Sequence, residues 1–246
     1  DHRDLHSFPT RRSSDLVGRN CNRIANAKFT INGVEYQLEA NDNENSLHSG
    51  SNGTSERFWN VISCTDQMIT LQIEDADLQQ GYPGNAVIQV TYEVTEDNGL
   101  AITYHAKADK DTVFNFTNHA YINLNGHASG SVLDQTLQIK ASHFTPVKDG
   151  KAIPTGELAD VEGTPFDFRI AKPIGRDINA ENDQLKYGSG YDHNFALDHT
   201  GNGVEKVATA YAPESGIQME VYTDCPGMQF YSANFIRGQK GKGGVI

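Results

Sequence analysis

Alternation of apolar and polar residues with a period of two dominates this chain from Lys28 onward. One run covers residues 28–31 and the next covers residues 34–39, with the pair Asn32-Gly33 between them. Period-two alternation places the apolar residues of a strand on one face. An Asn-Gly pair supplies the two positive φ angles of a type I′ turn, whose twist matches that of two antiparallel strands. This segment therefore predicts a β-hairpin.

The same pattern returns further along the chain. The runs that alternate, or have a composition typical of strands, are residues 69–74, 88–94, 100–105, 112–117, 136–140 and 219–223. The turn Asp97-Asn98-Gly99 joins two of these runs into a second hairpin. No window of adequate length carries a helical stripe. We therefore expect an all-β fold, a large antiparallel β-sandwich, with long ordered loops over the proline-punctuated residues 143–192.

Charge excludes two classes of partner. The chain has 246 residues, a formal net charge of -12 and a sequence pI near 5.1. Nucleic acids and anionic membranes are bound mainly by clustered Lys and Arg, so we expect neither as a partner. No run of roughly 18 apolar residues is present to span a bilayer. A neutral small molecule fits this charge better.

Three cysteines, Cys21, Cys64 and Cys225, are widely separated along the chain. Their odd number does not suggest a disulfide framework, and their spacing does not match a zinc motif. We expect them to be buried small hydrophobic residues in a reducing compartment, which favours a cytoplasmic location.

The first 16 residues differ from the rest of the chain. They have neither helical nor strand periodicity and no apolar signal-peptide core. The run from His6 to Leu16 resembles the translation of a sequencing adapter. We therefore expect residues 1–16 to be a non-native segment outside the packed domain, which would cover residues 17–246, and we expect any targeting signal to be missing.

Four clusters combine amide, imidazole or carboxylate groups with nearby apolar or aromatic side chains. They are residues 22–26, 45–48, 117–124 and 190–195. Sugar hydroxyls need directional donors and acceptors, while the C–H faces of a sugar pack on aromatic rings. The clusters are therefore candidates for a sugar site.

The order of these clusters resembles the aldose 1-epimerase (mutarotase) family. The matching motifs are NRIA at 22–25, NSLH at 45–48, NHxYxNL at 118–124, PxGExxxVxGTPFDFR at 154–169, GYDHNF at 190–195 and PGxQFY at 226–231. The resemblance runs from Gly18 to the end of the chain. It implies a galactose mutarotase-like supersandwich, incomplete here, and an isomerase that interconverts the anomers of free aldohexoses without a cofactor.

The resemblance also implies roles for individual residues. His119 would be the general acid, with His48 as a second catalytic imidazole. The residues that would hold the sugar hydroxyls are Asn22, Arg23, Tyr121, Asp192 and Gln229. The family's base is a glutamate that follows a run matching residues 241–244, and this chain ends at Ile246. We therefore expect the base to be missing from this chain, together with the early strands, and the chain itself to be nearly inactive.

Three other interpretations remain open. A non-catalytic sugar-binding module would use the same clusters. A sugar-phosphate epimerase would need several cations for a dianion, and Arg23 is the one Lys or Arg in the four clusters. A glycoside hydrolase would need two facing carboxylates, and no such pair is evident.

A metal site is not expected. The candidate ligands His48, His119, Asp192 and His193 lack a known local ligand spacing. We instead expect the site residues, though scattered in sequence, to line one open cleft on a sheet face.

Overall fold

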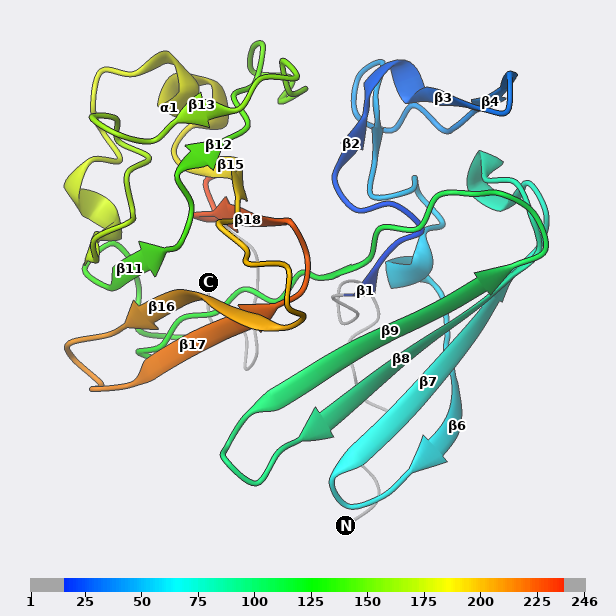
Figure 1. Cartoon of the computed structure of the whole chain (residues 1–246), viewed down its shortest axis with the longest axis horizontal. Coiled ribbons are helices and arrows are strands. Elements are labelled where there is room, and N and C mark those ends of the chain that lie inside the picture. Colours follow the sequence, from blue (N-terminus) through cyan, green and yellow to red (C-terminus); the bar gives the residue numbers. More distant parts are fainter. Residues whose placement is uncertain (1–15, 237–246) are drawn as a thin grey trace. The chain divides into compact units, whose positions relative to one another are not determined.

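A computed structural model describes residues 16–236, which fall into two compact units that meet in sequence between Ala120 and Tyr121 (Figure 1). The strands of the first unit are β1 (Leu16–Val17), β2 (Arg23–Ile24), β3 (Lys28–Ile31), β4 (Val34–Gln37), β5 (Ser46–Leu47), β6 (Asn60–Cys64), β7 (Met68–Asp75), β8 (Ala86–Val94), β9 (Leu100–Ala108) and β10 (Thr117–Asn118). Those of the second unit are β11 (Thr136–Ile139), β12 (His143–Phe144), β13 (Ala159–Asp160), β14 (Lys172–Pro173), β15 (Asp192–Ala196), β16 (Glu205–Tyr211), β17 (Gln218–Thr223) and β18 (Gly227–Tyr231). The all-β fold class is confirmed.

The first predicted hairpin is confirmed as β3 and β4, which pair antiparallel with Phe29 opposite Tyr36. Their rings stack with centroids 5.6 Å apart. The turn residues Asn32 and Gly33 have φ angles of 51° and 78°. Two consecutive positive φ angles define the type I′ turn that the Asn-Gly pair predicts.

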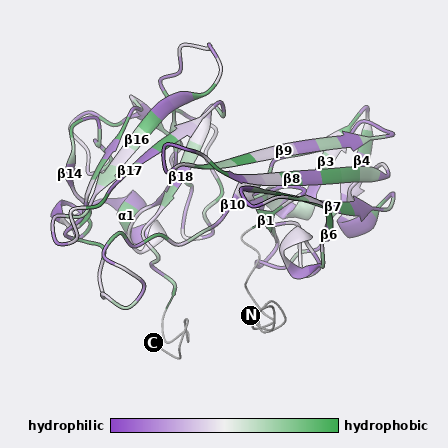
Figure 2. Cartoon of the chain, turned by 90° about the horizontal axis from the view of Figure 1, so that it is seen from below, coloured by the Kyte–Doolittle hydropathy of each residue, from purple (hydrophilic) through white to green (hydrophobic). Residues whose placement is uncertain are grey.

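The largest sheet of the first unit has the strand order β6-β7-β8-β9. Its register places Ile73 opposite Ile88 and Val90 opposite Tyr104, so that apolar residues share one face. Ile73 and Ile88 belong to a small buried cluster with Ala86. Figure 2 shows hydrophobic and hydrophilic residues intermixed along β7, β8 and β9, as expected for strands with one buried face.

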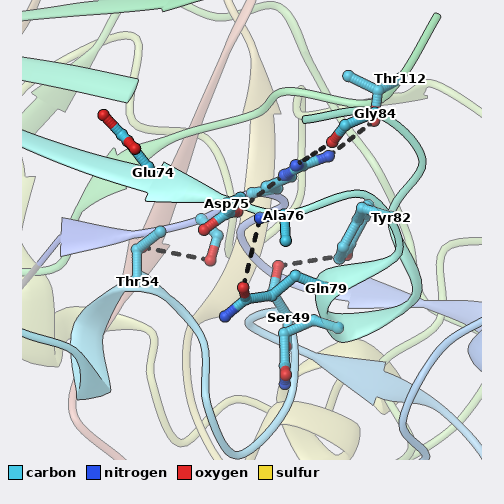
Figure 3. Close-up of polar contacts among 12 residues, drawn as sticks. Ser49, Thr54, Glu74, Asp75, Ala76, Gln79, Tyr82, Gly84 and Thr112 are labelled. Carbon is cyan, nitrogen blue, oxygen red and sulfur yellow. Dashed lines mark hydrogen bonds and ion pairs between the residues drawn. The ribbon is translucent and has the colours of Figure 1, made fainter. Parts of the chain in front are cut away.

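A charged side chain, Arg19, lies buried in the first unit with 1% of its surface exposed. Its Nε donates to Asp75 Oδ2 at 2.8 Å, and its Nη2 donates to the carbonyl of Gly84 at 2.7 Å. Arg57 also pairs with Asp75, which is 5% exposed. Figure 3 labels Asp75, Gly84 and Thr112, each of which accepts a hydrogen bond from this guanidinium. Each guanidinium nitrogen donates at least one hydrogen bond and Asp75 supplies the counter-charge, so the buried charge is compensated.

The second unit contains two four-stranded sheets, with the orders β14-β11-β16-β17 and β13-β12-β15-β18. Their apolar residues share one core, in which the aromatic members are Phe144, Phe166, Phe168, Tyr191 and Phe195. The rings of Phe144 and Phe166 stack with centroids 4.4 Å apart. This core holds β15 and β18, the two strands that carry candidate sugar ligands.

Residues 143–192 are mostly loops, as predicted, but they include a 3₁₀ turn at Ile174–Arg176 and one short α-helix, α1 (Asp183–Gly188). Asn182 caps this helix, since its side chain accepts from the backbone N–H of Gln184 and Leu185. Ser189 ends it in a left-handed conformation with φ 54°. A helix of this length carries too few turns to produce a detectable stripe in the sequence.

The predicted strand over residues 112–117 is wrong except at its end, where Thr117 enters β10. The cause is Arg19. Thr112 Oγ1 accepts from the guanidinium at 3.1 Å, and the ring of Phe114 lies 5.7 Å from its central carbon. The backbone N–H of Asn115 donates to the carbonyl of Arg19. Contacts with Arg19 therefore determine the backbone path of residues 112–116, which do not form a strand.

Two further expectations need correction. Leu16 forms β1, pairs with Asn118 and is 6% exposed, so the packed part of the chain includes this residue. Residues 1–15 lie outside the described residues, and their assignment stays a prediction. The cysteines are free, but Cys64 and Cys225 are exposed and Cys21 is partly so. Cys64 is the last residue of the edge strand β6. All residues of this strand are exposed, so Cys64 is not buried in a core there.

Within residues 16–236, no helix has the length and apolar character needed to cross a membrane.

Candidate active site

Two of the sequence clusters meet through a short strand pairing in the first unit. β2 pairs with β5, with Arg23 opposite Leu47 and Ile24 opposite Ser46. The backbone N–H of Asn26 donates to the side chain of Asn45 at 3.0 Å. The NRIA and NSLH motifs are therefore neighbours in space, and each supplies polar groups to the other.

Asn22 and His48 are bonded to each other in both directions. The backbone N–H of His48 donates to the carbonyl of Asn22 at 3.2 Å, and the backbone N–H of Asn22 donates to His48 Nδ1 at 3.0 Å. The φ angles of the two residues are 62° and 53°. Burial lowers the pKa of His48 to about 4, helped by the nearby His119 and Arg23 and opposed by Asp42. The imidazole is therefore neutral at pH 7.

His119 follows β10 and approaches His48. The two rings meet edge to face, with centroids 5.3 Å apart and an interplanar angle of 86°. The preceding residue, Asn118, is anchored, since its Nδ2 donates to the hydroxyl of Tyr92 on β8 at 3.2 Å. Its Oδ1 accepts from the backbone N–H of Ala120 at 3.1 Å. Bonds on both sides thus set the backbone around His119.

Arg23 is held by a carboxylate beside this imidazole pair. Its Nε donates to Asp42 Oδ2 at 2.7 Å, and the two side chains are 17% and 24% exposed. Its backbone N–H donates to Asn22 Oδ1 at 2.9 Å. The guanidinium is therefore oriented and its charge is partly balanced by Asp42.

In the second unit, Asp192 and Gln229 lie on the paired strands β15 and β18, where Asp192 is opposite Tyr231. Gln229 Nε2 donates to Asp192 Oδ1 at 2.7 Å. Tyr121 lies against Tyr231, with ring centroids 6.0 Å apart and an interplanar angle of 65°. Tyr121 is 56% exposed, and the ring it contacts belongs to the strand partner of Asp192.

His193 follows Asp192 on β15 and is buried, with 1% of its surface exposed. Its Nδ1 accepts from the backbone N–H of Asp192 at 3.3 Å, and its Nε2 lies 3.2 Å from Gln184 Oε1. The rings of Phe144 and Phe166 flank it, with centroid distances of 5.8 Å and 4.6 Å. Burial lowers the pKa of His193 to about 4. Both nitrogens are engaged inside the protein, which makes this residue a support for Asp192.

The predicted site residues fall into two groups, one in each unit. The first consists of Asn22, Arg23, His48 and His119. The second consists of Tyr121, Asp192 and Gln229, and Tyr231 contacts Tyr121 and is the strand partner of Asp192. That both groups line one cleft stays a prediction.

The structure adds Asp42 and Tyr231 to these groups. Tyr231 ends the PGxQFY motif, so its position was already marked in the sequence. Asp42 lies in a loop rich in Asn and Asp, and nothing in the sequence distinguishes it from its neighbours.

A comparison with known protein families matches residues 5–244 to the family model described as aldose 1-epimerase. The match begins inside residues 1–16, which lack strand periodicity. The aldose 1-epimerase of Escherichia coli strain K12 is 40% identical over 227 residues, which are 92% of this chain and 65% of that protein. The galactose mutarotase of Sus scrofa is 40% identical over 237 residues, with coverage of 94% and 65%.

Among solved structures, an aldose epimerase homologue from C. elegans superposes with a TM-score of 0.83 at 30% identity, covering 93% of this chain and 67% of that one. The chain thus spans about 65% of the length of the curated relatives named above.

Proposed function

Because this chain belongs to the aldose 1-epimerase family, we propose that the protein it represents interconverts the α and β anomers of a free aldohexose such as galactose or glucose. The observation that carries the proposal is the imidazole pair of His48 and His119, 5.3 Å apart beside the oriented guanidinium of Arg23. The mammalian relative's name, galactose mutarotase, supports galactose as a substrate.

Ring opening of a hemiacetal requires one proton to reach the ring oxygen while another leaves the anomeric hydroxyl. His119 is the proposed acid, because imidazole is the side chain that changes charge near neutral pH. The open aldehyde then rotates about the bond between C1 and C2, and the ring closes on its other face. The acid and the base exchange roles during closure, so no cofactor is consumed.

The remaining site residues are proposed to hold the sugar. Asp192 accepts from hydroxyl groups and is already oriented by Gln229 at 2.7 Å. Arg23 donates to hydroxyl oxygens from a guanidinium that Asp42 fixes in place. The exposed ring of Tyr121 offers an apolar surface to the C–H face of the sugar.

The base in this proposal is the glutamate that the family resemblance places after the run matching residues 241–244. None of the carboxylates among residues 16–236 is assigned this role. Asp42 is engaged with Arg23, and Asp192 is engaged with Gln229.

The arrangement favours a neutral sugar over a sugar phosphate. A phosphate dianion needs cations whose charge is available to it. Arg23 is paired with Asp42 at 2.7 Å, so part of its charge is already compensated. This counts against a sugar-phosphate epimerase.

Polarimetry on freshly dissolved α-galactose and α-glucose tests the proposal. A form extended to the length of the relatives is expected to speed mutarotation of both sugars, and to act much more slowly on glucose 6-phosphate. Loss of activity in its His119→Ala variant supports the assignment of the acid. An extended form that leaves mutarotation at the background rate contradicts the proposed function.

The 246-residue chain is assayed in parallel. Little turnover is expected from it, because it does not contain the proposed glutamate, and a positioned base raises the rate roughly 10²- to 10⁴-fold. Robust turnover by this chain, abolished by His119→Ala, would show that a carboxylate within it serves as the base.

A further inference from the structure

Asn22 contacts His48 through its backbone and not through its side chain. Building on the proposed function, we propose that Asn22 is a positioning residue whose left-handed backbone holds His48 as the neutral tautomer protonated on Nε2. In this arrangement His48 meets the sugar as a fixed hydrogen-bond donor, and His119 alone carries the proton to the ring oxygen.

The tautomer follows from the chemistry of the donor. A backbone N–H can donate a hydrogen bond but cannot accept one. The N–H of Asn22 points at His48 Nδ1 from 3.0 Å, so this nitrogen presents its lone pair. In a neutral imidazole the proton then lies on Nε2. Side-chain amides and hydroxyls leave such an assignment open because they can rotate, whereas this donor cannot.

The backbone of Asn22 is suited to this task. Its φ of 62° lies in the left-handed region, which asparagine adopts more readily than most residues. Its Oδ1 accepts from the N–H of Arg23 at 2.9 Å, so the side chain stabilises the local turn. The carbonyl of Asn22 accepts from the N–H of His48 at 3.2 Å. Imidazole and backbone are therefore fixed by the same residue.

The chain beyond His48 is held as firmly on its other side. Ser49 is buried, and its Oγ accepts from the N–H of Asn20 at 2.9 Å and lies 3.2 Å from the hydroxyl of Tyr82. Figure 3 shows this link between Ser49 and Tyr82. The carbonyl of Ser49 accepts from Gln80 Nε2 at 3.1 Å. The backbone of His48 is therefore held by hydrogen bonds to Asn22 and by those of the next residue, Ser49. This fixes the position from which the imidazole ring projects.

Protonating Nδ1 would place two N–H groups against each other at the contact with Asn22. The charged groups around the ring add to this cost, because Arg23 and His119 disfavour a second positive charge. Asp42 would favour the protonated imidazole, but this carboxylate already forms an ion pair with Arg23 at 2.7 Å. Geometry and charge thus select the same neutral form. A group that stays neutral donates to a sugar oxygen at any pH at which the enzyme works.

Long-range ¹H–¹⁵N correlation spectra of the 246-residue chain test the tautomer without sugar or activity. His48 is expected to show Nδ1 in the range of an unprotonated imidazole nitrogen and Nε2 in that of a protonated one, unchanged from pH 8 to pH 5.5. Nδ1 in the protonated range, or an average of the two tautomers, would overturn the inference. Because no turnover is measured, this result is independent of whether the proposed function is correct.

Three substitutions separate the backbone from the side chain. Asn22→Gly keeps the N–H and accepts a positive φ, so the spectrum of His48 should not change. Asn22→Ala strains the same backbone and should move Nδ1 toward the protonated range. Asn98→Ala places the same strain at φ 63° in the distant β8–β9 turn and should leave His48 unchanged. Equal spectra for Asn22→Ala and Asn98→Ala would contradict the positioning role.

Kinetics of the extended, active form complete the test. Asn22→Ala should lower kcat more than Asn22→Gly, because only the alanine strains the backbone that fixes His48. Equal kcat values for these two variants would contradict the positioning role. His48→Gln retains an N–H donor and should remain within about tenfold in kcat, while His48→Phe should lose roughly 10²-fold or more. Equal losses for the two variants would show that His48 does not act as a donor.

Discussion

The largest deeply buried side chain of the first unit is charged, whereas the second unit buries four large aromatic side chains alongside one charged residue, Lys172. Arg19 and Asp75 are 1% and 5% exposed and hold the first unit through directional bonds to a few specific atoms. In the second unit, Phe166 and Phe168 pack in one apolar cluster, where contact does not depend on a single partner. The two units therefore differ in which substitutions they should tolerate.

Two imidazoles among the residues of the candidate site also differ in their surroundings. His48 and His193 each accept a backbone N–H on Nδ1, from Asn22 and Asp192 respectively, and each has a pKa lowered to about 4. The second nitrogen separates them. Nε2 of His193 lies against Gln184 inside the core, while the ring of His48 is partly exposed and meets His119. A lowered pKa alone therefore does not identify a catalytic histidine, and the surroundings of the second nitrogen do.

The largest effect is expected for His119→Ala in the extended form, where kcat should fall roughly 10²- to 10⁴-fold because the proposed acid is removed. Polarimetry measures the loss, and circular dichroism checks that the fold is retained. His105→Ala, an exposed histidine on β9 of the same unit, is the matched control and should keep the parent activity. Equal activities for the two variants would remove His119 from the mechanism.

Asp75→Asn tests the directional contacts of the first unit. The two side chains have the same shape, but the change leaves the buried charge of Arg19 without a counter-charge, which costs about 3–5 kcal/mol of unfolding free energy. Denaturant unfolding measures this. Glu35→Gln breaks the exposed pair with Lys28 in the same unit and should cost far less. If both variants lose equal stability, the buried network is not what holds this unit.

Acidic pH should destabilise the chain through His193. Its pKa is about 4 in the folded chain against an ordinary value of 6.5, so below pH 6.5 the unfolded chain binds a proton that the folded chain excludes. The contribution is complete above pH 6.5 and is lost as the pH falls toward 4. At pH 5 this residue should cost about 2 kcal/mol. Unfolding curves at pH 7.5 and 5 measure the change, and His193→Gln should reduce it by that amount.

Phe166→Leu should have the smallest effect, although it removes part of a fully buried ring. The neighbouring rings can close in on leucine, since apolar contact has no fixed direction, so the expected cost is below about 1.5 kcal/mol. Denaturant unfolding compares it with Phe58→Leu, a residue that is 96% exposed and should change stability by less than about 0.5 kcal/mol. A loss larger than that of Asp75→Asn would reverse the contrast between the two units.

Much of the fold and the site could be predicted because their signals are local. The hairpin around Asn32 and Gly33 follows from two residues and the alternation beside them. The motifs marked His119 and Asp192 as candidates before any contact was known. Asp42 could not be predicted, because its role depends on Arg23 lying 19 positions away in sequence and 2.7 Å away in space. The irregular path of residues 112–116 was missed for the same reason, since Arg19 determines it.

The sequence by itself determined the two hairpins with their turns, the family and the identity of the candidate site residues, because alternation, turn chemistry and short motifs act over a few neighbouring positions. Only the tertiary structure decided which of these residues meet. The bond between Asn22 and His48 spans 26 positions, and that between Asp192 and Gln229 spans 37. Strand pairing creates both contacts, and the protonation state and orientation of each side chain depend on the atoms it meets there.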